Sequence, residues 1–349
     1  MTTPFEARGV WTALATPFAE DGRLDLDAYR RLVRFQREEG VTGVVPCGTT
    51  GESPTLTWEE HDALVDVCVE ESGGVLGVLA GAGSNDTEAA IRATRDAREH
   101  GANAALLVDC YYNGPSSLEL RTEYYERVLD AVPEIPIVPY VIPGRTGCAL
   151  AAEDLAILHL ASPARVPAVK QATGDLERMR RDRALAGDGL AILSGDDDMT
   201  LAMMRDPGIR ASGVISVMSN LVPRALREMV DAQSAGDEAR AAELGAKLAP
   251  LFKVVGVSAR SVRVLPGGRE VEVQDKFRNP LPLKTMMAGL GMIGGRCRPP
   301  LGRMTPAAIA ACRDALRAVW RDAPEVLEPI EAAFGVRIEA RLADDACWS

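Results

Sequence analysis

Short apolar runs alternate with helical stretches along the first two thirds of this chain, and this rhythm constrains the fold more than any other feature. Eight runs are predicted to be strands, at residues 10–15, 43–46, 75–80, 104–108, 135–140, 166–170, 190–193 and 213–217. The eight stretches after them are predicted to be helices, at residues 25–39, 57–71, 87–100, 117–131, 152–160, 176–185, 199–204 and 223–234. Many of these helices follow Ser, Thr or Asp, which are favoured N-caps. The alternation predicts an α/β fold of the (β/α)8 TIM-barrel class.

An open, doubly wound sheet is the main alternative to a barrel. That fold usually carries a Gly-x-Gly-x-x-Gly fingerprint after its first strand, and no such motif follows the first predicted strand here. We therefore predict a (β/α)8 catalytic barrel at residues 1–235 and a C-terminal helical region at residues 236–349.

The C-terminal region has a different pattern. Helices are predicted at residues 238–252, 283–290 and 304–323. After the first of them, valines at alternate positions flank a Pro-Gly-Gly turn, which predicts an inserted β-hairpin near residues 261–273. An isolated hairpin is marginally stable, so we expect this one to dock on the helical tail or on a second subunit. Residues 325–349 form a further appendage.

The composition favours a cytoplasmic enzyme over a membrane protein or a nucleic-acid-binding protein. Of the 349 residues, 47% are hydrophobic, which is enough to build a large core. The sequence has no apolar run of about 18 residues to span a membrane, and its first residues lack the layout of a signal peptide. The formal net charge of −11 disfavours binding to nucleic acid or to an anionic membrane surface.

The cysteines and histidines give no sign of a metal site. Seven cysteines are scattered without a Cys-x-x-Cys pair, as expected for free thiols in a reducing cytoplasm. Three isolated histidines lack the spacing of metal ligands. We therefore expect neither a metal nor another cofactor.

Lys170 is the first candidate for chemistry. It ends the predicted strand at residues 166–170, and the chain then turns through Thr and Gly into a helix. An unpaired buried charge is costly, but a buried amine can lose its proton and attack a carbonyl carbon. On this segment alone, a lysine that extends into solvent is the commoner case.

Other distinctive residues also follow predicted strands, at the end where barrel enzymes carry their chemistry. Thr49 and Thr50 lie on a glycine-flanked loop that can hold a carboxylate, although hydroxyls that cap the next helix are about as common. Tyr140 ends the fifth strand and Tyr112 follows the fourth; a phenol can relay protons, but an aromatic anchor is its more usual role. The planar guanidinium of Arg145 can bind a substrate carboxylate through two hydrogen bonds, or it can form a salt bridge with an acidic residue of a neighbouring loop.

These motifs resemble the dihydrodipicolinate synthase / N-acetylneuraminate lyase family of class I aldolases. The motifs that carry the resemblance are Gly48-Thr-Thr-Gly-Glu-Ser53, Tyr111-Tyr-Asn113, Tyr140 with Pro143-Gly-Arg-Thr-Gly147, Lys170 with Ala172-Thr-Gly-Asp175, Ser194-Gly-Asp-Asp197 and Gly213-Val-Ile-Ser-Val217. The similar segments cover roughly residues 6–255 and resume near residues 279–323. The motifs are most similar to those of members that condense pyruvate with L-aspartate 4-semialdehyde to 4-hydroxy-tetrahydrodipicolinate, in diaminopimelate and lysine biosynthesis.

The resemblance implies a role for each candidate. Lys170 would form a Schiff base with pyruvate, and Thr49 and Thr50 would hold the pyruvate carboxylate. Tyr140, Thr49 and Tyr112 would form a proton relay, with Tyr112 reaching the site of a neighbouring subunit in a homodimer or homotetramer. Arg145 would bind the carboxylate of the aldehyde substrate.

Two further contacts and two departures complete the comparison with the family. Gly195 and the backbone carbonyl of Ile215 would line the site, although in isolation both belong to ordinary strand ends. Val141 stands where the family usually has Asn, and Gln171 stands where it usually has Glu. Both departures follow active-site residues, so we expect them to border the active centre and to leave the acceptor aldehyde open. The hairpin near 261–273 and the final segment have no counterpart in the usual family form.

Two other functions remain open at this stage. A pyruvate-dependent aldolase or lyase of the same family could act on another 2-oxo acid or aldehyde. A non-catalytic barrel could instead bind a small 2-oxo acid as a sensor, with Lys170 protonated and unreactive.

Overall fold

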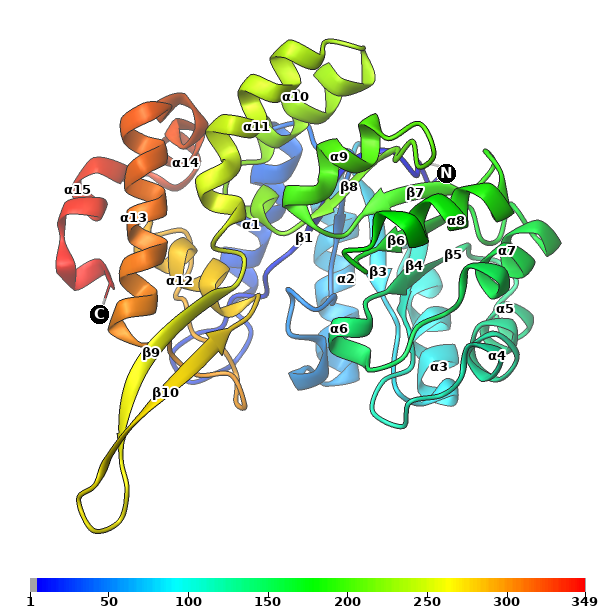
Figure 1. Ribbon diagram of the computed structural model, residues 1–349, viewed down its shortest axis with the longest axis horizontal. Helices are drawn as coiled ribbons and strands as arrows, with labels where there is room; N and C mark the ends of the chain where they lie inside the picture. The colour runs from blue at the N-terminus through cyan, green and yellow to red at the C-terminus, as the bar shows by residue number, and fades with distance from the viewer. Residues whose placement is uncertain (1–4, 349) are drawn as a thin grey trace.

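A closed barrel of eight parallel strands forms the centre of the molecule (Figure 1). The computed structural model describes residues 5–348. The barrel strands are β1 (Gly9–Ala13), β2 (Gly43–Val45), β3 (Gly77–Gly81), β4 (Ala104–Val108), β5 (Ile137–Val141), β6 (Ala168–Gln171), β7 (Ala191–Ser194) and β8 (Gly213–Ser216). Each strand pairs in parallel with its sequence neighbour, and β1 pairs with β8 to close the ring. The predicted (β/α)8 barrel is confirmed.

Helices follow the strands and cover the outside of the barrel (Figure 1). They are α1 (Leu26–Glu38), α2 (Trp58–Ser72), α3 (Thr87–Glu99), α4 (Ser117–Glu119), α5 (Glu126–Ala131), α6 (Pro143–Thr146), α7 (Ala152–Ala161), α8 (Leu176–Ala186), α9 (Thr200–Arg205) and α10 (Pro223–Ser234). The single helix predicted at 117–131 consists of α4 and α5 with a π-helical stretch, Leu120–Tyr125, between them. Among the helices that the structure describes, none is long and apolar enough to cross a bilayer.

The inside of the barrel is a packed core rather than a channel, as in other TIM barrels. Trp11 is fully buried there and lies against Gly43 on β2 and Gly77 on β3. A Cβ atom at either glycine would come within 2.4 Å of the Trp11 ring, so neither position has room for a side chain. Leu106 and Val138 belong to the same interior cluster. With its interior filled, the barrel can bind ligands only at the ends of its strands.

The C-terminal region packs beside the barrel, next to α1 and α10 (Figure 1). Its helices are α11 (Glu238–Phe252), α12 (Leu281–Gly289), α13 (Pro306–Asp322), α14 (Glu328–Phe334) and α15 (Ile338–Ala343). The last two place residues 325–348 on the body of the protein, where Trp348 is buried against Gly289. The division of the chain at residue 235 stays a prediction.

The inserted hairpin is present and is longer than the sequence indicates. Its strands are β9 (Val257–Val264) and β10 (Glu270–Phe277), so it extends beyond 261–273 at both ends. The β9 strand contacts α13, as expected for docking on the helical tail, but the rest of the hairpin projects away from the body (Figure 1). Val262 and Val264 are exposed there, and docking on a second subunit stays a prediction.

A buried ion pair ties the C-terminal region to the loop after β2. Lys284 on α12 and Glu52 both have fully buried side chains, and Lys284 Nζ lies 2.6 Å from Glu52 Oε1. The ammonium also donates to the backbone carbonyls of Thr16, at 2.8 Å, and of Arg296, at 2.5 Å. Glu52 Oε2 accepts the backbone N–H of Arg298 at 2.9 Å. Both charges are therefore paired and hydrogen-bonded, which is the condition for burying them.

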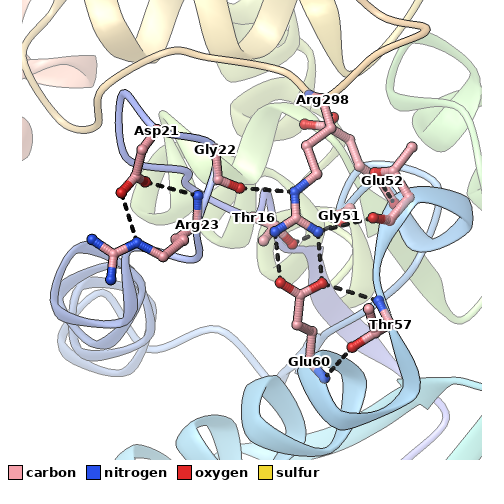
Figure 2. Close-up of polar contacts among 10 residues, drawn as sticks. Thr16, Asp21, Gly22, Arg23, Gly51, Glu52, Thr57, Glu60 and Arg298 are labelled. Atoms are coloured by element: carbon pink, nitrogen blue, oxygen red, sulfur yellow. Dashed lines mark hydrogen bonds and ion pairs between the residues drawn. The ribbon is translucent and has the colours of Figure 1, made fainter.

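The side chain of Arg298 extends this connection (Figure 2). Its guanidinium makes two hydrogen bonds of 2.6 Å to the carboxylate of Glu60 on α2. It also donates to the backbone carbonyls of Gly22 and Thr55, each at 2.9 Å. Such paired Arg–carboxylate bonds fix geometry as well as adding energy. The loop between α12 and α13 is thus bound to the loops after β1 and β2.

Replacing Lys284 with Met should destabilise the protein strongly. Glu52 would keep its buried carboxylate but lose its counter-charge, which typically costs about 3–5 kcal/mol in the free energy of unfolding. Urea denaturation of both proteins measures this difference. Lys247→Met is the matched control, because Lys247 pairs with the largely exposed Glu243 and Glu325 and should contribute only about 0–1 kcal/mol. Equal losses in the two variants would contradict the structural role of Lys284.

Candidate active site

Lys170 lies at the centre of the carboxyl end of the barrel. It is in β6 directly beside Tyr140 of β5, with which it is paired in the strand register. Its side chain is only 5% exposed, and its Nζ lies 4.0 Å from the centroid of the Tyr140 ring. Gly195, after β7, lies against the same side chain: a Cβ atom there would come 3.1 Å from Lys170 Cε and 2.7 Å from Ala172 Cβ. Gly195 therefore leaves the space that the lysine occupies.

Burial changes the acid–base behaviour of Lys170. The pKa of Lys170 is lowered to about 8, mainly because the buried ammonium loses its solvent, with a smaller lowering from the nearby charge of Arg145. The carboxylates of Asp196 and Asp197 act in the opposite direction and raise this pKa. At pH 7 about one lysine in ten would be neutral at such a pKa, against about one in several thousand for an ordinary lysine. The amine is thus available as a nucleophile near neutral pH.

Tyr140 and Thr49 line a pocket of about 220 Å³ at this end of the barrel, together with Tyr111, Arg145 and Thr146. Burial raises the pKa of Tyr140 well above its usual value, while a hydrogen bond with Thr49 lowers it in part. The phenol therefore stays protonated over the whole physiological range. A hydroxyl pair of this kind can pass a proton between a ligand and solvent.

Arg145, which lines this pocket, and Thr50, which follows the pocket residue Thr49, lie on two different loops. Thr50 is 2% exposed and lies in the loop after β2, where Glu52 adopts a left-handed conformation with φ of 58°. Arg145 is exposed on α6, the short helix after β5. Both residues hydrogen-bond to Asn279 of the C-terminal region. The structure thus brings together Lys170, Tyr140, Thr49, Thr50, Arg145 and Gly195 around one end of the barrel.

The side chains of two other predicted residues, Tyr112 and Ile215, do not line the pocket. Tyr112 is 89% exposed, with a left-handed φ of 80°, and its side chain does not line the pocket of its own chain. Ile215 lies in β8 with its side chain fully buried in the interior cluster, so only its backbone can face a ligand.

The two departures from the family pattern point away from the pocket, contrary to the expectation from sequence. Side chains alternate between the two faces of a strand, so the residue after an inward-facing one faces the helices. Val141 accordingly packs in the outer core, whereas Tyr140 belongs to the interior cluster. Gln171 is fully buried and its amide donates to Asp182 on α8. Neither residue borders the space beside Lys170.

Two further residues of the site are assigned no role from the sequence. Asp197 is buried and accepts the backbone N–H groups of Val217, at 3.1 Å, and Met218, at 3.0 Å, so it connects the loop after β7 with the end of β8. Burial raises the pKa of Asp197 to about 6. Asn279 is the second, and only its place before a Pro marks it in the sequence. Within residues 5–348, no group of three or more His, Cys, Asp or Glu side chains is arranged to hold a metal ion.

The fold and these side chains define a TIM-barrel enzyme built around a buried lysine. The chain belongs to the Dihydrodipicolinate synthetase family, whose sequence model matches residues 6–319. The 4-hydroxy-tetrahydrodipicolinate synthase of Methanothrix thermoacetophila is 42% identical over 310 residues, which cover 88% of this chain and 96% of that protein.

Solved structures of dihydrodipicolinate synthases are also similar to this chain. Dihydrodipicolinate synthase from Aquifex aeolicus is 36% identical with a TM-score of 0.78, and the match covers 89% of this chain and 97% of that one. The chloride-inhibited dihydrodipicolinate synthase from Acinetobacter baumannii, complexed with pyruvate, is 31% identical with a TM-score of 0.79. That match covers 90% of this chain and 99% of the other. The relatives are thus covered almost completely, whereas about a tenth of this chain has no equivalent in them.

The lowered pKa of Lys170 predicts a pH dependence for its reaction with carbonyl compounds such as pyruvate. Only the neutral amine reacts, so the rate should rise about tenfold per pH unit below pH 8 and level off above it. Asp196→Asn provides the control: because the Asp196 charge raises the pKa of Lys170, removing it should move the break to lower pH. A break near pH 10 in the wild type would mark Lys170 as an ordinary lysine.

Proposed function

We propose that this chain condenses pyruvate with L-aspartate 4-semialdehyde to give 4-hydroxy-tetrahydrodipicolinate through a Schiff base on Lys170. The observation that carries the proposal is the buried Lys170 amine, with its pKa lowered to about 8, beside the Tyr140 phenol. Membership of the family supports it. The names of relatives that are 37–42% identical over most of this chain support the choice of substrates.

The first half of the reaction activates pyruvate. The neutral amine of Lys170 attacks the ketone carbon, and water leaves to give an iminium. Thr49 and Thr50 hold the pyruvate carboxylate. The iminium withdraws electrons from the methyl group, whose proton passes to the relay of Tyr140, Thr49 and Tyr112, leaving an enamine. The attack needs a neutral amine, which the lowered pKa of Lys170 provides. The Tyr140 phenol is protonated, so it receives the methyl proton only as it passes its own proton along the relay.

The second half joins the two substrates. The enamine carbon attacks the aldehyde carbon of the semialdehyde, and the aldehyde oxygen takes a proton from the relay. The amino group of the semialdehyde then replaces Lys170 on the iminium carbon, which closes the ring and frees the lysine. Arg145 binds the carboxylate of this second substrate at the mouth of the pocket, while Gly195 and the Ile215 carbonyl line the site.

The exposure of Tyr112 supports an assembly of more than one subunit. The Tyr112 phenol is 89% exposed and lies outside the pocket of its own chain, so it is free to complete the site of a neighbour. We infer that the active form is a homodimer or homotetramer. We expect it to act in the cytoplasm on pyruvate and a small aldehyde, without a metal or another cofactor. Residues 1–235 supply the catalytic barrel.

Replacing Lys170 with Ala should abolish Schiff-base formation and leave the fold intact. Borohydride reduces an iminium to a stable amine, so treatment with pyruvate and borohydride should fix one pyruvate-derived mass on the wild type and none on the variant. Lys253→Ala, at an exposed position, is the control and should be labelled like the wild type. The intact masses of the wild type and the two variants, measured after this treatment, show which of them carry the label. Continued labelling of Lys170→Ala would refute the role of Lys170.

Replacing Arg145 with Ala should mainly weaken use of the semialdehyde. A hydrogen bond to a charged group contributes about 1.5–3 kcal/mol, so kcat/KM for this substrate should fall roughly 10- to 150-fold while pyruvate trapping persists. Arg181→Ala is the control, because Arg181 pairs with Glu153 on the surface, between α8 and α7. Steady-state kinetics with both substrates decide the question. Unchanged kinetics in Arg145→Ala would favour a pyruvate-dependent aldolase that takes a different acceptor.

A further inference from the structure

Asn279 connects the C-terminal region to two residues that are proposed to bind carboxylates. It lies between β10 and α12 and is 8% exposed. Its Nδ2 donates to Thr50 Oγ1 at 2.9 Å, and its backbone carbonyl accepts from Arg145 Nη2 at 2.8 Å. One residue outside the barrel therefore contacts the loops after both β2 and β5.

The hydrogen bond to Thr50 determines which way the threonine hydroxyl points. A hydroxyl has one hydrogen to donate and two lone pairs that accept. Because the Asn279 amide occupies an acceptor position of Thr50 Oγ1, the hydroxyl hydrogen is left for another acceptor, such as a substrate carboxylate. Arg145 is held in a similar way, since one N–H bonds to the Asn279 carbonyl and the others stay available.

The side chain of Asn279 carries an energetic penalty that a residue with a purely structural role would not need. Its Oδ1 atom is buried and has no hydrogen-bond partner among residues 5–348. A buried acceptor without a partner destabilises the folded state, so an apolar residue would suit a structural role better. The bond from Nδ2 to Thr50 gives a reason for an amide at this position.

Both ends of this hydrogen bond are fixed by the fold. Glu52 follows Thr50 by two residues, and Lys284 lies on the helix that begins just after Asn279. The buried pair of Lys284 and Glu52, at 2.6 Å, holds the two segments together, and the Arg298 contacts reinforce it (Figure 2). Groups held in place before a ligand arrives bind it at a lower entropic cost.

We propose that Asn279 is a positioning residue that orients both carboxylate contacts of the site. It directs the Thr50 hydroxyl toward the 2-oxo acid and the Arg145 guanidinium toward the second substrate. The inference rests on the proposed function and adds to it a residue from the C-terminal region. No proton or bond of the reaction passes through Asn279, so its loss weakens recognition of pyruvate without removing the Schiff base.

The first test separates binding from chemistry. Asn279→Ala should raise KM for pyruvate roughly 3- to 10-fold, the effect of one lost hydrogen bond, with kcat within about twofold of the wild type. Asn279→Asp keeps the shape of the side chain but places a negative charge beside both carboxylate contacts, so KM should rise on the order of 100-fold. If either variant fails to fold, Asn279→Ser replaces it: this variant also removes the amide that donates to Thr50, so KM for pyruvate should again rise.

A double-mutant cycle then shows whether Asn279 acts through Thr50. Thr50→Val removes the hydroxyl, so adding Asn279→Ala to it should raise KM for pyruvate no further. The control is Asn220→Ala: Asn220 is also buried, but its amide bonds the backbone carbonyls of Ala13 and Val217. That variant should lower Tm and leave KM for pyruvate unchanged.

The outcomes distinguish this inference from the function on which it rests. An unchanged KM in Asn279→Ala, or additive effects with Thr50→Val, would overturn the positioning role while the wild type still traps pyruvate with borohydride. A wild type that traps no pyruvate would instead overturn the proposed function itself. A rise in KM that disappears in the Thr50→Val background would support the inference.

Discussion

The hydrogen bonds between β1 and β8 close the eight-stranded sheet, and the geometry of the site depends on that closure. In a closed parallel barrel the carboxyl ends of all strands meet in one ring. Residues far apart in the sequence, such as Thr49, Tyr140 and Lys170, therefore come within reach of one another. The interior of the barrel around Trp11 is filled by buried side chains, so the ring of strand ends lies on a packed core rather than on an open channel.

The chemistry of the site follows from the cost of burying charge. A lysine that is 5% exposed has a lowered pKa, and a buried tyrosine beside it has a raised one. The two shifts have the same cause and opposite consequences: the amine can lose its proton, and the phenol keeps its own. Where a full charge is needed for structure, as at Lys284, the fold supplies Glu52 and two carbonyls instead. The environment thus lowers the pKa of one buried lysine and pairs the other with a carboxylate.

Regular patterns made much of this structure predictable. The barrel strands, the helix at residues 238–252 and the hairpin all carry local periodicity or turn residues, and each is present. The site residues on strand ends could be found because a strand's end is visible in the sequence. The hairpin's length was underestimated because several residues that extend it, such as Arg260, Gln274 and Lys276, are polar and exposed and give little strand signal.

By itself the sequence determined the fold class, the strand that carries Lys170 and the order of the candidate residues along the ring, because these depend on neighbours in the chain. Only the tertiary structure decided which way side chains face and which distant residues meet them. It turned Val141 and Gln171 away from the pocket, left Tyr112 exposed, and placed Asn279 against Thr50 and Arg145. Such contacts depend on how separate elements pack, and local periodicity carries no record of that packing.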